Sequence, residues 1–283
     1  MAKMFERTEI AGISLPRILI GTNWLLGWSH TSPSADKMIT NRFDTCEKFY
    51  PLFEAYAQYG VDAIMAPASQ QPLLIDAINY YRDKSGKDII IVDTPIINVS
   101  DSAADRAEAE AAIKESARIG AVLCLPHHTS VEQLVNKNKG TIERLEDYTK
   151  MIRSAGMVPG LSAHMPELVL YSDANGYDVE TYIQLYNCMG FLMQIEVETI
   201  ASIINNAKKP VIVIKTMAAG RCTPYVGLNF VWNTIRKKDI VTLGAFSPDE
   251  VHEDVEISFA ALERRFPDME KRASANNDQV LLS

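Results

Sequence analysis

The chain of 283 residues carries 28 Lys and Arg against 36 Asp and Glu, which gives a formal net charge of −8. This acidic balance provides no broad basic surface for a nucleic-acid backbone or an anionic membrane leaflet, so neither is expected as a partner. With 47% hydrophobic and 23% charged residues, the composition is typical of a folded protein with a sizeable core. The length favours one large domain over residues 1–283.

Apolar, β-branched segments recur along the chain about every 35 residues, the spacing of β/α units. They predict eight strands, at residues 17–22, 61–67, 88–93, 121–125, 158–162, 180–186, 210–216 and 240–245. Helix-start signals stand between them, at residues 130–133, 223–224 and 247–250. Because most of the strands are apolar throughout, as in a parallel sheet buried on both faces, we predict an α/β fold, a single (β/α)₈ TIM barrel.

Two segments fall outside this repeat: residues 23–43 after the first strand, and a polar tail over residues 266–283. A loop of about 20 residues in a compact domain is usually a lid, a binding loop or an ordered insertion. We expect residues 23–43 to lie over the barrel mouth. The tail is interpreted as an oligomer arm or a disordered end.

The amino terminus and the cysteines indicate a reducing compartment. No apolar segment follows the first basic residues, and no apolar run reaches the ~20 residues that cross a bilayer. The cysteines lack C-x-x-C spacing, which argues against a disulfide framework or a zinc ribbon. They are Cys46, Cys124, Cys188 and Cys222. We therefore expect a cytoplasmic protein, and a homo-oligomer on general grounds.

Histidines gather after the strands, at the end of the barrel where barrel enzymes place reactive groups. His127 and His128 follow the fourth strand, His164 the fifth, and His30 lies in the segment after the first. Joined by Asp93 after the third strand, His127, His128 and His164 could bind a divalent metal with one position open for water or substrate. The alternative is a pair of surface-loop histidines and a backbone cap, since no H-x-H or H-E-x-x-H spacing is present.

Lys215 ends the apolar seventh strand, where it could serve as a Schiff-base nucleophile, an anchor for an anionic substrate, or an ion-pair partner of Asp93. The anchor or ion-pair role is favoured. Small residues and Arg221 follow it, close to where barrels often bind a phosphate group. The residues expected to contact substrate are Asn23, Trp24, His30, Ser162, Asn187, Gly220, Arg221 and Ser247.

Several strand ends resemble those of the aldo-keto reductase superfamily. The resemblance spans roughly residues 120–262 and rests on Leu125–His128, Gly160–His164, Tyr186–Asn187, Lys215–Gly220 and Gly244–Val251 followed by Glu253–Asp254. It implies an aldo-keto-reductase-like barrel in which His127 takes the position of the family's catalytic histidine. It also implies NAD(P) as cofactor.

The chain departs from the family at the other positions of its catalytic Asp, Tyr, Lys and His set. Met65 stands where the resemblance places the Asp, Asp93–Thr94 replaces the Lys, and no Tyr follows the second strand. Asp44 and Tyr50 are similar to the family's Asp and Tyr pair, but they come before the first helix of the repeat and not after the second strand. The basic residue that family members often use for the cofactor's 2′-phosphate falls near Glu250, which would repel that phosphate.

These observations lead to three hypotheses. The first is a metal-assisted lyase, isomerase or hydrolase that acts on a small polar or anionic molecule. In it His127, His164, Asp93 and Lys215 are catalytic, and a divalent metal is held by His127, His128, His164 and Asp93. The second is an NAD(P)-dependent oxidoreductase in which His127 and Lys215 replace the missing residues. The third is a barrel that binds a small ligand without catalysis.

Overall fold

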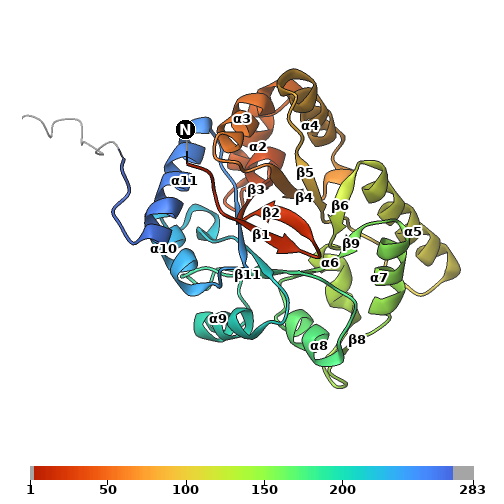
Figure 1. Ribbon diagram of the computed structural model, residues 1–283. Helices are drawn as coiled ribbons and strands as arrows, with labels where there is room; N and C mark the ends of the chain where they lie inside the picture. Colours follow the sequence, from red (N-terminus) through yellow and green to blue (C-terminus); the bar gives the residue numbers. More distant parts are fainter. Residues whose placement is uncertain (1–2, 270–283) are drawn as a thin grey trace, which may run out of the picture.

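Parallel strands in the order of the sequence form a barrel in the computed structural model, which describes residues 3–269 (Figure 1). The strands are β3 (Ile18–Gly21), β4 (Ala63–Ala66), β5 (Ile90–Asp93), β6 (Ala121–Cys124), β9 (Val158–Pro159), β10 (Leu161–Ala163), β11 (Tyr182–Leu185), β12 (Val211–Ile214) and β13 (Ile240–Leu243). They pair in the order β10-β11-β12-β13-β3-β4-β5-β6-β9. Because β9 and β10 are two halves of one strand, the ladder returns to its start. All eight predicted strands and the (β/α)₈ architecture are confirmed.

Gly160 separates β9 from β10, and the barrel closes at this residue. A Cβ atom there would lie 2.7 Å from Leu125 Cγ and 2.8 Å from Thr181 Cγ2, inside normal contact distance. The absence of a side chain therefore lets the neighbouring strands approach one another at this point.

Helices surround the barrel on its outer face (Figure 1). They are α3 (Tyr50–Ala57), α4 (Pro72–Ser85), α5 (Ala103–Arg118), α7 (Leu145–Ser154), α8 (Glu167–Asn175), α9 (Val197–Asn206), α10 (Pro224–Thr234) and α11 (Pro248–Glu263). The helix starts predicted at residues 223–224 and 247–250 are confirmed, and Ser247 accepts a hydrogen bond from the Glu250 amide. The capping box predicted at residues 130–133 is wrong. A short helix, α6 (His128–Val131), already begins before it, and the Ser130 hydroxyl bonds to the Ile97 backbone instead.

The barrel interior is filled with aliphatic side chains. This inner cluster comprises Leu19, Ala63, Val92, Leu123, Leu125, Ile183, Ile212 and Ile240, together with Ile10 and Leu15. The last two belong to a hairpin of β1 (Arg7–Ile10) and β2 (Ile13–Pro16), which the sequence analysis did not predict. Figure 1 shows this hairpin across the middle of the barrel. It closes the amino-terminal end, so the carboxyl end is left for a site.

Residues 23–43 are an ordered insertion with two helices, α1 (Asn23–Leu26) and α2 (Pro33–Arg42). Trp24 and Arg42 both pack on Phe246, just beyond the end of β13, with ring or guanidinium centres 6.1 Å and 4.7 Å from its ring centre. The insertion therefore packs at the carboxyl end of the barrel, next to the end of β13. Of the polar tail over residues 266–283, only the first four residues belong to the described part of the chain. Within residues 3–269, no helix is both long and apolar enough to span a membrane.

We predict that Gly160→Ala lowers the free energy of unfolding by about 1–3 kcal/mol, because its methyl group overpacks the barrel wall. Urea denaturation of the purified protein measures this change. In a Leu125→Ala background the same substitution should cost less, because one of the two colliding side chains is gone. An equal cost in both backgrounds would contradict the packing explanation.

Candidate active site

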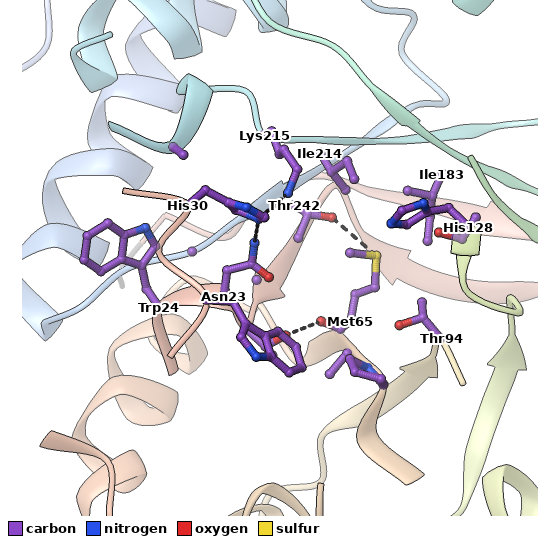
Figure 2. A pocket seen from close by; sticks show the side chains of 18 of the residues that line it. Asn23, Trp24, His30, Met65, Thr94, His128, Ile183, Ile214, Lys215 and Thr242 are labelled. Atoms are coloured by element: carbon purple, nitrogen blue, oxygen red, sulfur yellow. Dashed lines mark hydrogen bonds between the residues drawn. The ribbon is translucent and has the colours of Figure 1, made fainter. Parts of the chain in front are cut away.

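A cavity of about 430 Å³ opens at the carboxyl ends of the strands (Figure 2). Its floor is mostly apolar and is formed by inward side chains near the strand ends: Met65, Ile183, Ile214 and Thr242. Polar groups and two tryptophans line the upper wall: Asn23, Trp24, Trp28, His30, Thr94, His127, His128, Ser162, His164 and Lys215. A largely apolar cavity with a few converging polar groups is the usual form of a small-molecule site.

Three imidazoles line one side of the cavity. His127 and His128 follow β6, and His164 follows β10. The His128 ring stacks on that of His164, with centroids 3.6 Å apart and planes 18° apart, and the His127 centroid lies 4.2 Å from that of His128. His127 Nδ1 lies 2.8 Å from the Thr129 hydroxyl oxygen and accepts a 3.4 Å hydrogen bond from the Thr129 amide. The amide contact favours the neutral tautomer that carries its proton on Nε2.

Burial holds two of these imidazoles in the neutral form. It lowers the pKa of His127 to about 4 and that of His164 to about 3, and the nearby charges of His128 and Lys215 act in the same direction. Glu132 lies behind the cluster, where its Oε1 accepts hydrogen bonds from the His164 and Met165 amides at 2.6 Å and 2.7 Å. Its burial opposes ionisation, but hydrogen bonds from His128 and these amides lower its pKa. His127 and His164 are therefore uncharged hydrogen-bonding groups at pH 7.

Lys215 supplies the cationic group of the cavity. It follows β12 with a left-handed backbone (φ 58°), and its Nζ lies 2.8 Å from His30 Nε2. Asn23 Nδ2 lies 3.1 Å from the same imidazole nitrogen. Burial lowers the pKa of Lys215 to about 8, and burial and the Lys215 charge also lower the pKa of His30. Lys215 is thus mostly protonated at pH 7 and donates to a neutral His30.

None of the residues that line this cavity in the described chain is an Asp or a Glu. His30 accepts a hydrogen bond from the Lys215 ammonium, but its ring brings no negative charge. A buried cation without a carboxylate is costly, which is why its pKa falls. The cavity is therefore electropositive, although the whole chain is acidic.

The structure brings nine of the predicted site residues together in the cavity wall: Asn23, Trp24, His30, His127, His128, Ser162, His164, Lys215 and Gly220. Asp93 is not among them. Its side chain is fully buried outside the cavity, where it accepts a hydrogen bond from the Ser69 amide. The structure gives no support to a catalytic role for Asp93 or to an ion pair with Lys215, because the Asp93 side chain leaves the strand on the outer face.

Three residues predicted to contact substrate stabilise the rim of the mouth instead. Asn187 Oδ1 accepts hydrogen bonds from the Met189 and Phe191 amides and so closes its own loop. The Arg221 guanidinium lies 3.9 Å from the centre of the Phe191 ring and donates to the His30 carbonyl, which holds the insertion in place. Ser247 caps α11. Their positions after strands were correctly predicted, but their side chains are engaged in local contacts.

The structure gives no support to the metal site. Among residues 3–269, no group of three or more His, Cys, Asp or Glu side chains could hold a metal ion. The stacked arrangement of His128 and His164 explains this, because parallel rings do not direct their nitrogens at a common point. Asp93, the expected fourth ligand, lies outside the cavity.

Four residues on the floor of the cavity were not predicted from the sequence: Met65, Ile183, Ile214 and Thr242. They are inward residues within the strands, whereas the prediction was limited to residues at or after the strand ends. The alternation of inward and outward side chains along a strand is the signal that would have found them.

Comparisons with known proteins identify the fold. No protein-family model matches the sequence, and no curated protein matches it. A structure assigned to the aldo-keto reductases from Pseudomonas aeruginosa is 15% identical, with a TM-score of 0.65 over 93% of this chain and 98% of that one. An aldo-keto reductase from Klebsiella pneumoniae in complex with NADPH is 16% identical, with a TM-score of 0.55 over 96% and 98%. Aldose reductase from Giardia lamblia is 12% identical, with a TM-score of 0.52 over 94% and 91%.

These matches confirm the predicted fold: the chain is an aldo-keto-reductase-like (β/α)₈ barrel. They cover nearly all of this chain and nearly all of each matching chain, so the likeness extends well beyond the residues 120–262 that carried the resemblance in sequence. Function has to be argued from the cavity, because one barrel fold supports many reactions.

We predict that Lys215→Met stabilises the protein at pH 7, by as much as about 3 kcal/mol, because the buried charge is removed. The pKa of Lys215 is lower in the folded than in the unfolded state, so its charge opposes folding fully below pH 8. The advantage of the variant should therefore shrink as the pH rises above 8. Thermal unfolding between pH 7 and 10 measures it.

Lys37→Met is the matched control, because Lys37 is exposed on α2. This substitution should leave the melting temperature within about 1 °C of the parent protein, since exposed positions change stability little. A Lys215→Met protein that is less stable than the parent at pH 7 would contradict the account of an unpaired buried cation.

Proposed function

We propose that this chain is an oxidoreductase that uses a nicotinamide cofactor to reduce the carbonyl group of a small molecule held in the mouth cavity. The observation that carries the proposal is the placement of His127 Nε2–H and the Lys215 ammonium on the wall of one cavity. Structures of similar fold support it, including the NADPH complex of the Klebsiella pneumoniae protein. This hypothesis replaces the metal-assisted one.

The residues present fit the nicotinamide end of the cofactor. The cavity offers apolar walls for a flat ring, and the Ser162 hydroxyl lines it. The residues expected near the adenosine end of the cofactor do not fit both forms of the cofactor equally well. α11 begins with Asp249 and Glu250, and Glu250 Oε2 accepts a 2.7 Å hydrogen bond from the Phe246 amide, which fixes this carboxylate. Such a charge repels a 2′-phosphate, so the chain suits NAD(H) better than NADP(H).

When bound, the nicotinamide would supply the hydride. The chain's own task is to bind the carbonyl oxygen, stabilise the negative charge that develops on it, and protonate it. His127 Nε2–H donates a hydrogen bond to that oxygen. Lys215 Nζ provides the positive charge and the proton, because its pKa of about 8 leaves it charged at pH 7 yet able to release a proton. The hydrogen bond to His30 directs the ammonium.

The same lysine favours a second candidate, a lyase or isomerase that forms an imine with its substrate. With a pKa of about 8, about a tenth of Lys215 is the free amine at pH 7. Nζ would attack the carbonyl carbon and release water. Cyanoborohydride added with a small 2-oxo acid would reduce that imine to a stable amine, and a mass adduct at Lys215 would favour this candidate over the first.

We predict that NADH binds with a dissociation constant in the micromolar range and that NADPH binds at least tenfold more weakly. Tryptophan fluorescence titration measures both constants, because Trp24 and Trp28 line the cavity. Glu250→Gln should narrow the gap between the cofactors without weakening NADH, since it removes the charge that repels the 2′-phosphate. If neither cofactor binds at millimolar concentration, the proposal fails, and the non-catalytic binding barrel gains support.

We predict that carbonyl reduction by the loaded enzyme declines as the pH rises above about 8, because Lys215 then loses the proton that it donates. The charged and titratable groups around it are His30, His127, His164 and Arg221. His127 and His164 titrate well below this range. Lys215→Met should lower kcat/KM at least 100-fold and abolish the decline. A profile that is flat to pH 10 in the parent protein would show that another group is the donor.

A further inference from the structure

We infer that the substrate is a small 2-oxo monocarboxylate with an apolar chain, or the matching 2-hydroxy acid in the reverse direction. This inference rests on the proposed function and deepens it by giving the class of molecule that is reduced. It starts from an imbalance of charge, because the cavity holds a cation and no anion.

Two carboxylates that lie close to cavity-lining residues, Asp36 and Glu132, are engaged elsewhere. Asp36 Oδ1 accepts hydrogen bonds from the amide and hydroxyl of Ser29, at 2.8 Å and 2.6 Å. Glu132 faces His128 and accepts hydrogen bonds from backbone amides. No carboxylate of the described residues therefore pairs with the Lys215 ammonium, and a ligand could supply one. A bound carboxylate would offset the cost of burying it.

The number of cations limits the number of negative charges on the ligand. Lys215 is the one Lys or Arg among the cavity-lining residues of the described chain. Arg221 stands at the rim, but it stacks on Phe191 and donates to the carbonyls of Ala218 and His30. A second carboxylate inside the cavity would be buried without a counter-charge. The cavity thus selects a monoanion over a dianion.

The two roles of Lys215 determine where the carbonyl group lies on the substrate. Nζ both neutralises the carboxylate and supplies the proton to the carbonyl oxygen, so the two groups must reach one ammonium. They do so when they are adjacent, as in a 2-oxo acid. His127 Nε2–H, which lines the same wall, is the second donor to the carbonyl oxygen.

The remaining walls determine the other end of the molecule. Figure 2 shows Met65, Ile183 and Ile214 around the space below Lys215. These side chains offer no hydrogen bonds, so they favour an aliphatic chain over a polar one. A branched 2-oxo acid of about six carbons combines one carboxylate, an adjacent carbonyl and such a chain.

The test compares three ligands that differ in charge: 4-methyl-2-oxopentanoate, its primary amide, and the dianion 2-oxoglutarate. Isothermal titration of the protein without cofactor measures binding, and the reaction is not needed. We expect the monocarboxylate to bind at least tenfold more tightly than the amide or the dianion. Lys215→Arg should retain this order, since it keeps the charge, whereas Lys215→Met should bring the acid and the amide within about threefold. Lys37→Met is the control and should behave as the parent protein.

An amide that binds as tightly as the acid, a dianion that binds best, or a Lys215→Met protein with an unchanged preference would overturn the inference. So would the absence of binding of all three ligands at 10 mM concentration. These outcomes are separate from those of the NADH titration. A protein that binds NADH but prefers the amide keeps its proposed function and loses this substrate class, and one that prefers the acid but binds no dinucleotide keeps the anion site and loses the redox reaction.

Discussion

The partial burial of the Lys215 ammonium beside neutral imidazoles is the interaction on which the barrel mouth depends. A charged group that is withdrawn from water is tolerated only if neighbouring groups hydrogen-bond to it or if a bound ligand supplies the opposite charge. His30 provides the hydrogen bond, and its own position depends on the α1–α2 insertion and on Arg221. The lysine, the insertion and the loop after β12 therefore form one assembly that presents a positive charge at the mouth.

The rest of the fold positions this assembly at the carboxyl end of the barrel. The β1–β2 hairpin closes one end of the barrel, and Gly160 lets the strands close without a clash. Left-handed backbone at Lys215, Ala218, Ala219 and Gly220 turns the chain sharply after β12. Such conformations are unfavourable for residues other than glycine and are typical of functional sites. Here they place the lysine at the mouth of the cavity.

The sequence was sufficient to predict the barrel, because its evidence is eight apolar strands with regular spacing. An error in the bounds of any one strand leaves the predicted fold unchanged. The sequence also located the histidines and Lys215 at the mouth, since residues after parallel strands share one end of a barrel. Side-chain direction was harder to predict. Asp93 ends β5 and Lys215 follows β12, yet Asp93 points outward to Ser69 and Lys215 faces the cavity. That difference depends on the alternation within each strand and cannot be read from position alone.

The metal hypothesis failed for a related reason. The positions of the histidines after the predicted strands showed that imidazoles gather at one end of the barrel. The stacking of His128 on His164 arises from the packing of α6 against β10, which the sequence does not show. The β1–β2 hairpin escaped prediction because its strands are only four residues long, and half of their residues are polar. Two of their side chains, Ile10 and Leu15, are buried in the inner cluster.

The central claim, that Lys215 is a buried cation without a carboxylate partner, is tested most directly by NMR titration of protein labelled with ¹³C- and ¹⁵N-lysine. The account predicts one lysine side chain that titrates near pH 8, is absent from Lys215→Met, and moves to higher pH when 4-methyl-2-oxopentanoate is added. A Lys215 signal that titrates above pH 10, together with the other lysines, would contradict it.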